Sequence, residues 1–250
     1  SPFFEFTREF MNFEPEAYSL RWYRQMVGIS SIGDTTVVTN KWMLGTRNSF
    51  FIGIVATLLA TALGTVAALG LSRPHMPFKP VLMAILISPM IVPLIITAAG
   101  MFFFYSKIGL THTYLGLILA HTALGTPFVV ITVTATLTGF DTNLIRASQS
   151  LGADTMRTFF KVIMPLILPG VISGGLFAFI TSFDEVVVVM FVGSVEQITI
   201  PKQMWAGLRQ ETSPVILCMA TCLVALSIAL LTTVEMLRRR SERLRGIKLR

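Results

Sequence analysis

The sequence predicts an all-α, polytopic membrane protein with five transmembrane spans in its 250 residues. The chain is 53% hydrophobic and only 13% charged, whereas a soluble domain carries about 25% charged residues. Its mean hydropathy is +0.72. The apolar residues also gather into five uncharged runs, each long enough to cross the roughly 30 Å hydrocarbon core with about 20 residues. These observations exclude an ordinary soluble domain.

The segment before the first run, residues 1–48, mixes charges of both signs with aromatic residues. It lacks the basic start and continuous apolar core of a signal peptide. We expect it to be an external N-terminal segment, for the reason of orientation given below.

The five runs form one predicted transmembrane domain, residues 49–237. Small residues recur at four-residue spacing along the first run, which predicts a close helix-packing face. Pro89 and Pro93 should kink or break the second run. The runs are Ser49–Ser72, Pro80–Ser106, Ile108–Phe140, Val162–Phe183 and Thr212–Val234, and the small residues are Gly53, Ala56, Ala60, Gly64 and Ala68.

The positions of Arg and Lys predict the orientation, because these residues concentrate in cytoplasmic loops. Arg73 and Lys79 flank the turn after the first run, and further basic residues follow the third. Residues 238–250 hold seven Arg or Lys and one Glu, and form a predicted basic cytoplasmic tail. Two runs separate each of these three regions from the next, so all three lie on the same side of the membrane. Because they are basic, we expect that side to be the cytoplasm.

The same parity places residues 1–48 and the net-negative region 184–211 outside. An external N-terminus without a signal sequence is most simply explained by a further span before Ser1. We therefore expect six spans in the complete protein. Because the excess positive charge is confined to the tail, we expect no nucleic-acid partner.

The loop after the third run, Asp141–Pro169, is the longest break between runs that still carries an apolar face. Apolar residues recur there every three or four positions, as on one face of a helix. Asp141 or Asn143 can cap its start. Gly152 in mid-helix costs up to about 1 kcal/mol and indicates a bend or a close backbone approach. We predict a helix–Gly–helix outside the membrane, joined rigidly to the next span. The apolar positions are Leu144, Ala147, Leu151, Thr155, Phe159 and Val162.

This loop resembles the cytoplasmic coupling loop of ABC importer permeases. The family pattern is Glu-Ala-Ala, three residues, Gly, about nine residues and Ile-x-Leu-Pro. Arg146 stands where the family has Glu, and Ser148 and Met164 replace Ala and Leu. The alternative is an amphipathic helix on the membrane surface. The resemblance implies that residues 141–161 form the cytoplasmic coupling loop. It also implies that coupling to an ATPase involves Arg146, Ala147, Ser148, Leu151, Gly152, Ala153, Asp154, Phe159, Ile163 and Pro165.

Asp184 and Glu185 interrupt an otherwise apolar stretch. Ionisable groups at membrane depth are costly, and their default interpretation is functional. The surrounding SFDEVVVVMFV resembles the spermidine/putrescine (polyamine/opine) branch of the permease family. Carboxylates suit a polycationic substrate, and Phe179 and Phe183 could add cation–π contacts. The alternative is that the span ends at Phe183 and both acids are hydrated at its outer mouth.

The cysteines and two of the histidines of the chain are expected to have structural roles. Cys218 and Cys222 lie one helical turn apart in an apolar run and are expected to pack, since a metal site needs more ligands. His112 and His121 are expected to pack rather than bind a ligand. Trp205 is either an interfacial anchor or part of a docking surface. The sequence contains no G-x-x-x-x-G-K-[ST] motif, so ATP hydrolysis is not expected of this chain.

The resemblance implies the type I ABC importer transmembrane-domain fold and a multi-pass permease of the bacterial inner membrane with a cytoplasmic C-terminus. Its expected partners are a second, related permease subunit, two cytoplasmic ATPases, a periplasmic substrate-binding protein and membrane lipid. ATP and magnesium would be cofactors of the ATPase, with none in this subunit. The expected substrate is a polyamine. An opine, an amino-acid-like or another small solute is the alternative substrate, and a secondary transporter is the alternative class.

Overall fold

The structure is a computed structural model that describes residues 4–5, 17–18, 20–27, 36–73, 75–139, 141, 143–210, 215–228 and 232. The predicted all-α class is confirmed. Within the described residues, the exception is a two-residue antiparallel ladder between β1 (Phe4–Glu5) and β2 (Ala17–Tyr18). The chain divides into two compact units, residues 44–203 and residues 1–43 with 204–250.

Three described helices are long and apolar enough to cross a membrane. They correspond to the first, third and fourth predicted spans. The bent pair α3 and α4 passes the same test only jointly, which gives up to four spans. The fifth predicted span is represented by the shorter apolar helix Val215–Ile228, and the remainder of that run lies outside the described residues. The three long stretches are Lys41–Leu71, Tyr114–Thr138 and Thr155–Phe183.

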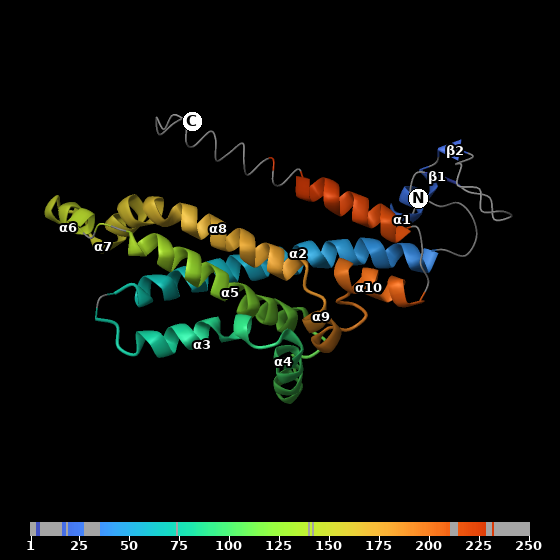
Figure 1. The fold of residues 1–250 in the computed structure, drawn as a ribbon, viewed down its shortest axis with the longest axis horizontal. Helices are drawn as coiled ribbons and strands as arrows, with labels where there is room; N and C mark the ends of the chain where they lie inside the picture. Colours follow the sequence, from blue (N-terminus) through green and yellow to red (C-terminus); the bar gives the residue numbers. More distant parts are fainter. Residues whose placement is uncertain are drawn as a thin grey trace. The chain divides into compact units, whose positions relative to one another are not determined.

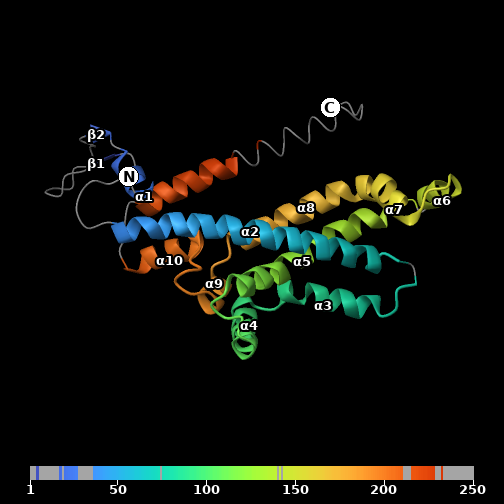
Figure 2. The same ribbon diagram turned by 180° about the vertical axis from the view of Figure 1, so that it is seen from behind.

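The predicted break in the second run is confirmed. It lies between α3 (Lys79–Ile91) and α4 (Leu94–Ile108), whose axes are bent by 103°. Val92 is extended, with φ −70° and ψ 135°, as expected for a residue before proline. Pro93 then stands at the N-cap of α4. Figures 1 and 2 both show α4 turned sharply away from the direction of α3.

The long helices of the 44–203 unit are α2 (Thr36–Leu71, in its part from residue 44), α5 (Tyr114–Thr138) and α8 (Met164–Phe183). The helices α5 and α8 run side by side in Figures 1 and 2. They share one apolar cluster with α2, made of Ala60, Ala68, Val129, Val133, Ile167, Val171 and Ala178.

The predicted small-residue face of α2 is confirmed, because all five of its residues are buried. A Cβ added to Gly64 would lie 2.7 Å from Val129 Cβ, so α2 and α5 approach more closely there than any side chain permits. This is the packing that small residues allow between membrane helices.

A second apolar cluster lies toward the other end of this unit, where α4 and α5 meet α9 (Val187–Val192). It contains Ile52, Ala98, Tyr105, Leu117, Ile118, Ala120, Leu124, Val188, Val189 and Val192. The unit also contains α6 (Asn143–Ser150), α7 (Thr155–Thr158) and the π-helix η1 (Phe159–Ile163), and it includes the first residues of α10 (Ile200–Gln210).

The other unit holds α1 (Arg21–Val27), the rest of α10 and the helix Val215–Ile228. A Cβ on Gly207 would lie 2.8 Å from Ile216 Cδ1, so α10 packs closely against the latter helix. The Arg209 guanidinium lies 5.3 Å from the ring centroid of Trp205. Cys218 is buried. The basic tail, residues 238–250, lies outside the described residues.

Candidate functional site

The loop between α5 and α8 begins as predicted, with an aspartate at the start of a helix. Asp141 Oδ1 accepts a hydrogen bond from the N–H of Asn143 at 2.9 Å, and the Asp141 carbonyl accepts from Leu144 N–H at 3.2 Å. The first N–H groups of a helix have no partner within it, so this contact fixes where α6 begins.

Gly152 does not lie in mid-helix, as the apolar periodicity suggested, but terminates α6. Its φ is +82°, a left-handed conformation that glycine adopts without a Cβ penalty. Gly152 N–H donates to Gln149 O at 2.9 Å and Ala153 N–H donates to Ser148 O at 3.1 Å, the two hydrogen bonds of a Schellman motif. A Cβ at Gly152 would meet no atom of the described residues within 4 Å. Backbone conformation therefore explains the glycine within this chain, and a close approach does not.

The chain then begins a second helix at once. Asp154 is the N-cap of α7, and its Oδ1 accepts from Arg157 N–H at 3.0 Å. The hydroxyls of Ser148 and Thr158 are 3.0 Å apart and join α6 to α7. The helix–Gly–helix prediction is therefore correct in arrangement, although the glycine ends one helix rather than bending a single one.

The second helix continues without interruption into the span. The π-helix η1 is closed by a hydrogen bond from Met164 N–H to Phe159 O, and α8 follows. The π turn directly precedes Pro165, whose ring would clash with the carbonyl four residues earlier in a regular α-helix. Thr155–Phe183 thus forms one continuous helical stretch of 29 residues that is long and apolar enough to cross a membrane, with Pro165 in the first turn of α8 and Pro169 inside the helix.

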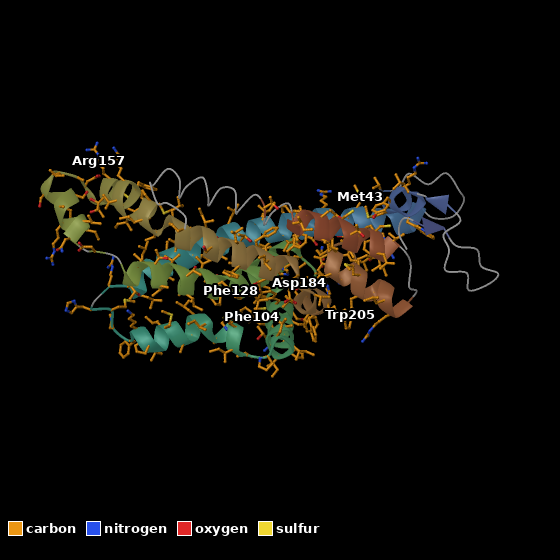
Figure 3. All side chains as sticks on the ribbon, turned by 45° about the horizontal axis from the view of Figure 1, so that its top comes forward. Met43, Phe104, Phe128, Arg157, Asp184 and Trp205 are labelled. Atoms are coloured by element: carbon orange, nitrogen blue, oxygen red, sulfur yellow. The ribbon has the colours of Figure 1, made fainter. Side chains whose placement is uncertain are left out.

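The predicted single apolar face is not continuous, because the break at Gly152 resets the helical phase. Leu151 is 88% exposed and Met156 is 63% exposed, while Phe159 and Ile163 are half-buried. Arg146 and Ala147 are exposed, and Ser148 is half-buried. Beside them lies an open hollow of about 540 Å³, lined by Gly152, Asp154, Met156, Arg157, Phe160 and Lys161. This end of the 44–203 unit therefore presents apolar and charged side chains together, with Arg157 projecting from it in Figure 3.

The structure separates the two carboxylates that the sequence pairs. Asp184 is the C-cap of α8 and its side chain is exposed. Glu185 is only 6% exposed, and its Oε1 accepts from Val188 N–H at 2.8 Å, at the start of α9. Burial raises the pKa of Glu185, and its hydrogen bonds to the first N–H groups of α9 oppose that rise. The two adjacent carboxylates therefore lie in different surroundings, Asp184 exposed and Glu185 buried.

Three aromatic rings pack together at the C-terminal end of α8, which Asp184 caps. Phe179 and Phe183 are stacked, with ring centroids 5.4 Å apart. Phe50 of α2 meets Phe183 edge-on at 5.2 Å. Gly53 makes room for this arrangement, because a Cβ there would lie 3.3 Å from Phe179 Cε2. The two predicted phenylalanines are therefore half-buried and held by packing, with one face of each ring covered by the other.

Several polar contacts around α9 and the start of α10 are not predicted by the sequence. Lys202 Nζ donates to the carbonyls of Val189, Gly193 and Ser194, and the buried side chain of Asn48 donates to the Glu196 and Ile198 carbonyls. Ser49 accepts from Ile200 N–H at 2.9 Å. Each contact joins residues that have no common sequence motif. In the sequence, a polar residue at the edge of an apolar run indicates that its side chain needs a hydrogen-bond partner, but it does not indicate which residue that partner is.

His121 is buried as expected, but it is also hydrogen-bonded. Its Nδ1 is 2.7 Å from the hydroxyl of Ser182, which is also buried. This contact ties α5 to the last turn of α8, directly before Asp184. A histidine within an uncharged apolar run is expected to have a specific polar partner. The sequence does not show which residue it is, because Ser182 lies 61 residues away.

Comparisons with known proteins agree with this architecture. Residues 60–243 match the family described as binding-protein-dependent transport system inner membrane component. The spermidine/putrescine transport system permease protein PotC of Haemophilus influenzae is 28% identical over 226 residues, covering 90% of this chain and 84% of that protein. The PotC of Escherichia coli K12 is 26% identical, covering 90% and 81%, and the E. coli K12 putrescine permease PotI is 26% identical, covering 83% and 73%.

Among solved structures, an inward-facing form of the MetNI methionine ABC transporter is similar in fold. The TM-score is 0.61 at 22% sequence identity, with 82% of this chain and 95% of that chain covered. At this identity the likeness concerns the fold alone.

Proposed function

The chain belongs to the family of binding-protein-dependent transport system inner-membrane components, and from this premise we propose that it forms the substrate pathway of an ATP-driven importer of polyamines such as spermidine or putrescine. The observation that carries the proposal is the unbroken helical stretch Thr155–Phe183. It joins the exposed segment around Leu151 at one end to the exposed carboxylate of Asp184 at the other. At 1.5 Å per residue it spans roughly 43 Å.

The segment Asp141–Lys161 is the proposed contact for a separate ATPase subunit, which would bind ATP and magnesium. Leu151 and Met156 are exposed there beside Arg146 and Arg157, and this mixture of apolar and charged side chains suits a partner surface more than bulk water. Because α7, η1 and α8 form one helix, a displacement of this end moves the other end as a rigid body. Coupling then requires no flexible connection.

Asp184 is the proposed ligand for a cationic substrate. A helix C-terminus carries a partial negative charge, which disfavours a carboxylate and favours a cation. Asp184 stands at such a terminus with its side chain exposed, so it contributes little to stability there. An ammonium group would meet both the carboxylate and the helix end. The names of three relatives, all polyamine permeases, support a polycationic substrate.

The remaining parts of the proposal concern the assembly. A second, related permease subunit, two ATPases and a substrate-binding protein would complete the importer in the bacterial inner membrane. The basic residues around Arg157 favour a cytoplasmic position for α6 and α7, and the basic tail would lie on the same side.

The test is transport by the assembled importer. The chain is co-expressed with its neighbouring subunits, purified with the ATPase and reconstituted in vesicles with the binding protein. ATP-dependent uptake of labelled spermidine is expected. Uptake of an uncharged or anionic solute with no response to spermidine would overturn the substrate, and failure of any ATPase to co-purify would overturn the importer.

A further inference from the structure

The short helix α9 has a charged side chain at each end. Glu185 Oε1 accepts from Val188 N–H at 2.8 Å at its start. Lys202 Nζ lies 3.1 Å from the carbonyl of Val189, 3.4 Å from that of Gly193 and 3.2 Å from that of Ser194 at its end. Helix ends leave N–H groups unpaired at the start and carbonyls unpaired at the finish. Each charge therefore has the sign that its end of the helix favours.

Both charged groups are withdrawn from water. Glu185 is 6% exposed and Lys202 is half-buried. A charge is costly to bury unless hydrogen bonds compensate it. An ammonium group has three donors, and three carbonyls accept from Lys202. These charges are thus engaged by the backbone of α9 and its C-terminal turn, which leaves them poorly placed to meet a solute.

The neighbouring Asp184 differs in every one of these respects. It is exposed, and it lies at the end of a helix whose dipole disfavours it. We propose that the two adjacent carboxylates have different roles: Glu185, together with Lys202, is a positioning residue that holds α9 in place, and Asp184 alone meets the transported cation. The Asp184 part rests on the proposed function, whereas the Glu185 part does not.

The helix α9, which Glu185 and Lys202 hold in place, forms one wall of an apolar hollow. Val188, Val189 and Val192 of α9 are buried in the cluster shared with α4 and α5. Met190 and Phe191 instead line a hollow of about 370 Å³ together with Ala99, Phe102 and Phe103 of α4. A shift of α9 would change the separation between these two walls, so the position of α9 can be measured across the hollow.

The experiment uses a cysteine pair across the hollow in the fully assembled importer. Ala99→Cys and Met190→Cys are introduced after Cys218 and Cys222 are replaced by alanine, and cross-linking by a short bifunctional maleimide is measured without substrate. Glu185→Ala and Lys202→Ala are expected to lower the cross-linking yield severalfold. Glu185→Gln should retain it, because the amide oxygen still accepts from Val188. Asp184→Asn is the matched control, since it removes the adjacent charge and should leave the yield at the parent value.

Spermidine uptake by the same variants, without the cysteine pair, separates the two roles. Asp184→Asn is expected to raise KM about tenfold, the effect of losing one charge-assisted hydrogen bond. Glu185→Ala should instead lower the maximal rate, and Glu185→Gln should rescue it.

The outcomes distinguish this inference from the proposed function. If Glu185→Ala cross-links like the parent, Glu185 does not hold α9 and the inference is wrong. If that variant loses cross-linking while Asp184→Asn leaves spermidine uptake unchanged, the positioning role stands and the polyamine pathway through Asp184 fails. Should Glu185→Ala prevent assembly, Lys202→Met tests the other end of α9, and parent-like cross-linking there would overturn the inference.

Discussion

Replacing Gly152 tests whether the loop between α5 and α8 depends on a left-handed residue. At φ +82° an L-residue with a Cβ is disfavoured by roughly 1–2 kcal/mol. Among the residues that the structure describes, no atom lies within 4 Å of the added Cβ, so no steric clash with them adds to this cost. Gly152→Ala should therefore depopulate the observed junction between α6 and α7 by a factor of about 5–30. Gly152→Asn should do so much less, because asparagine tolerates the left-handed region.

The assay is the ratio of spermidine transported to ATP hydrolysed by the reconstituted importer. We expect the ratio to fall in the order Gly, Asn, Ala, Val, because β-branched residues tolerate positive φ least. Gly152→Leu separates conformation from contact. It should match Ala if φ alone matters, and fall well below Ala if the glycine also lies against the ATPase. A Gly152→Asn variant as uncoupled as Gly152→Val would refute the conformational argument.

Three further predictions follow from other parts of the structure. Neutralising Asp184 as Asn should reduce uptake of spermidine far more than uptake of a neutral solute, at both low and high salt; a loss that fades with salt would mean only a screened surface charge. A cysteine at Lys107 should react with an impermeant reagent from outside and one at Arg157 should not, and external labelling of position 157 would reverse the topology. Gly64→Ala should lower the free energy of unfolding of the purified complex by about 1–3 kcal/mol, because the added methyl group overpacks against Val129. Gly70→Ala lies in the same helix, and no atom of the described part of the chain is within 4 Å of the added Cβ. It should be neutral or stabilising by up to about 1 kcal/mol, and equal losses in both variants would show that packing is not the cause.

Features that depend on a few neighbouring residues could be predicted from the sequence. Pro93 breaks the second apolar run because proline lacks a backbone donor and disfavours the helical conformation of the residue before it, and the small residues of α2 are buried because their spacing defines one helix face. Asp141 starts α6 through a contact two residues away. Local chemistry determines each of these outcomes.

Features that depend on where distant residues meet could not be predicted. The sequence presents Asp184 and Glu185 as a pair, but the turn between α8 and α9 sends one carboxylate outward and the other onto a helix N-terminus. Lys202 completes the opposite end of α9 from α10, and no local pattern points to it. The position of Gly152 was misjudged for a related reason, since a helix that stops and restarts after four residues imitates one continuous period.

The π-helix Phe159–Ile163 has a mechanical consequence for the span that contains it. A π turn accommodates one residue more than an α turn, and one residue corresponds to roughly 100° of rotation about the helix axis. The azimuth of Met156 and Arg157 is therefore offset from the direction that the rest of α8 would give them. Migration of this extra residue along the helix would reorient only the residues that it passes and would leave the two ends in their present relative orientation. Loss of the residue would instead turn one end against the other by about 100°. A one-residue deletion within Phe159–Ile163 is therefore expected to point Met156 and Arg157 in a different direction relative to the rest of α8, with hardly any change in length.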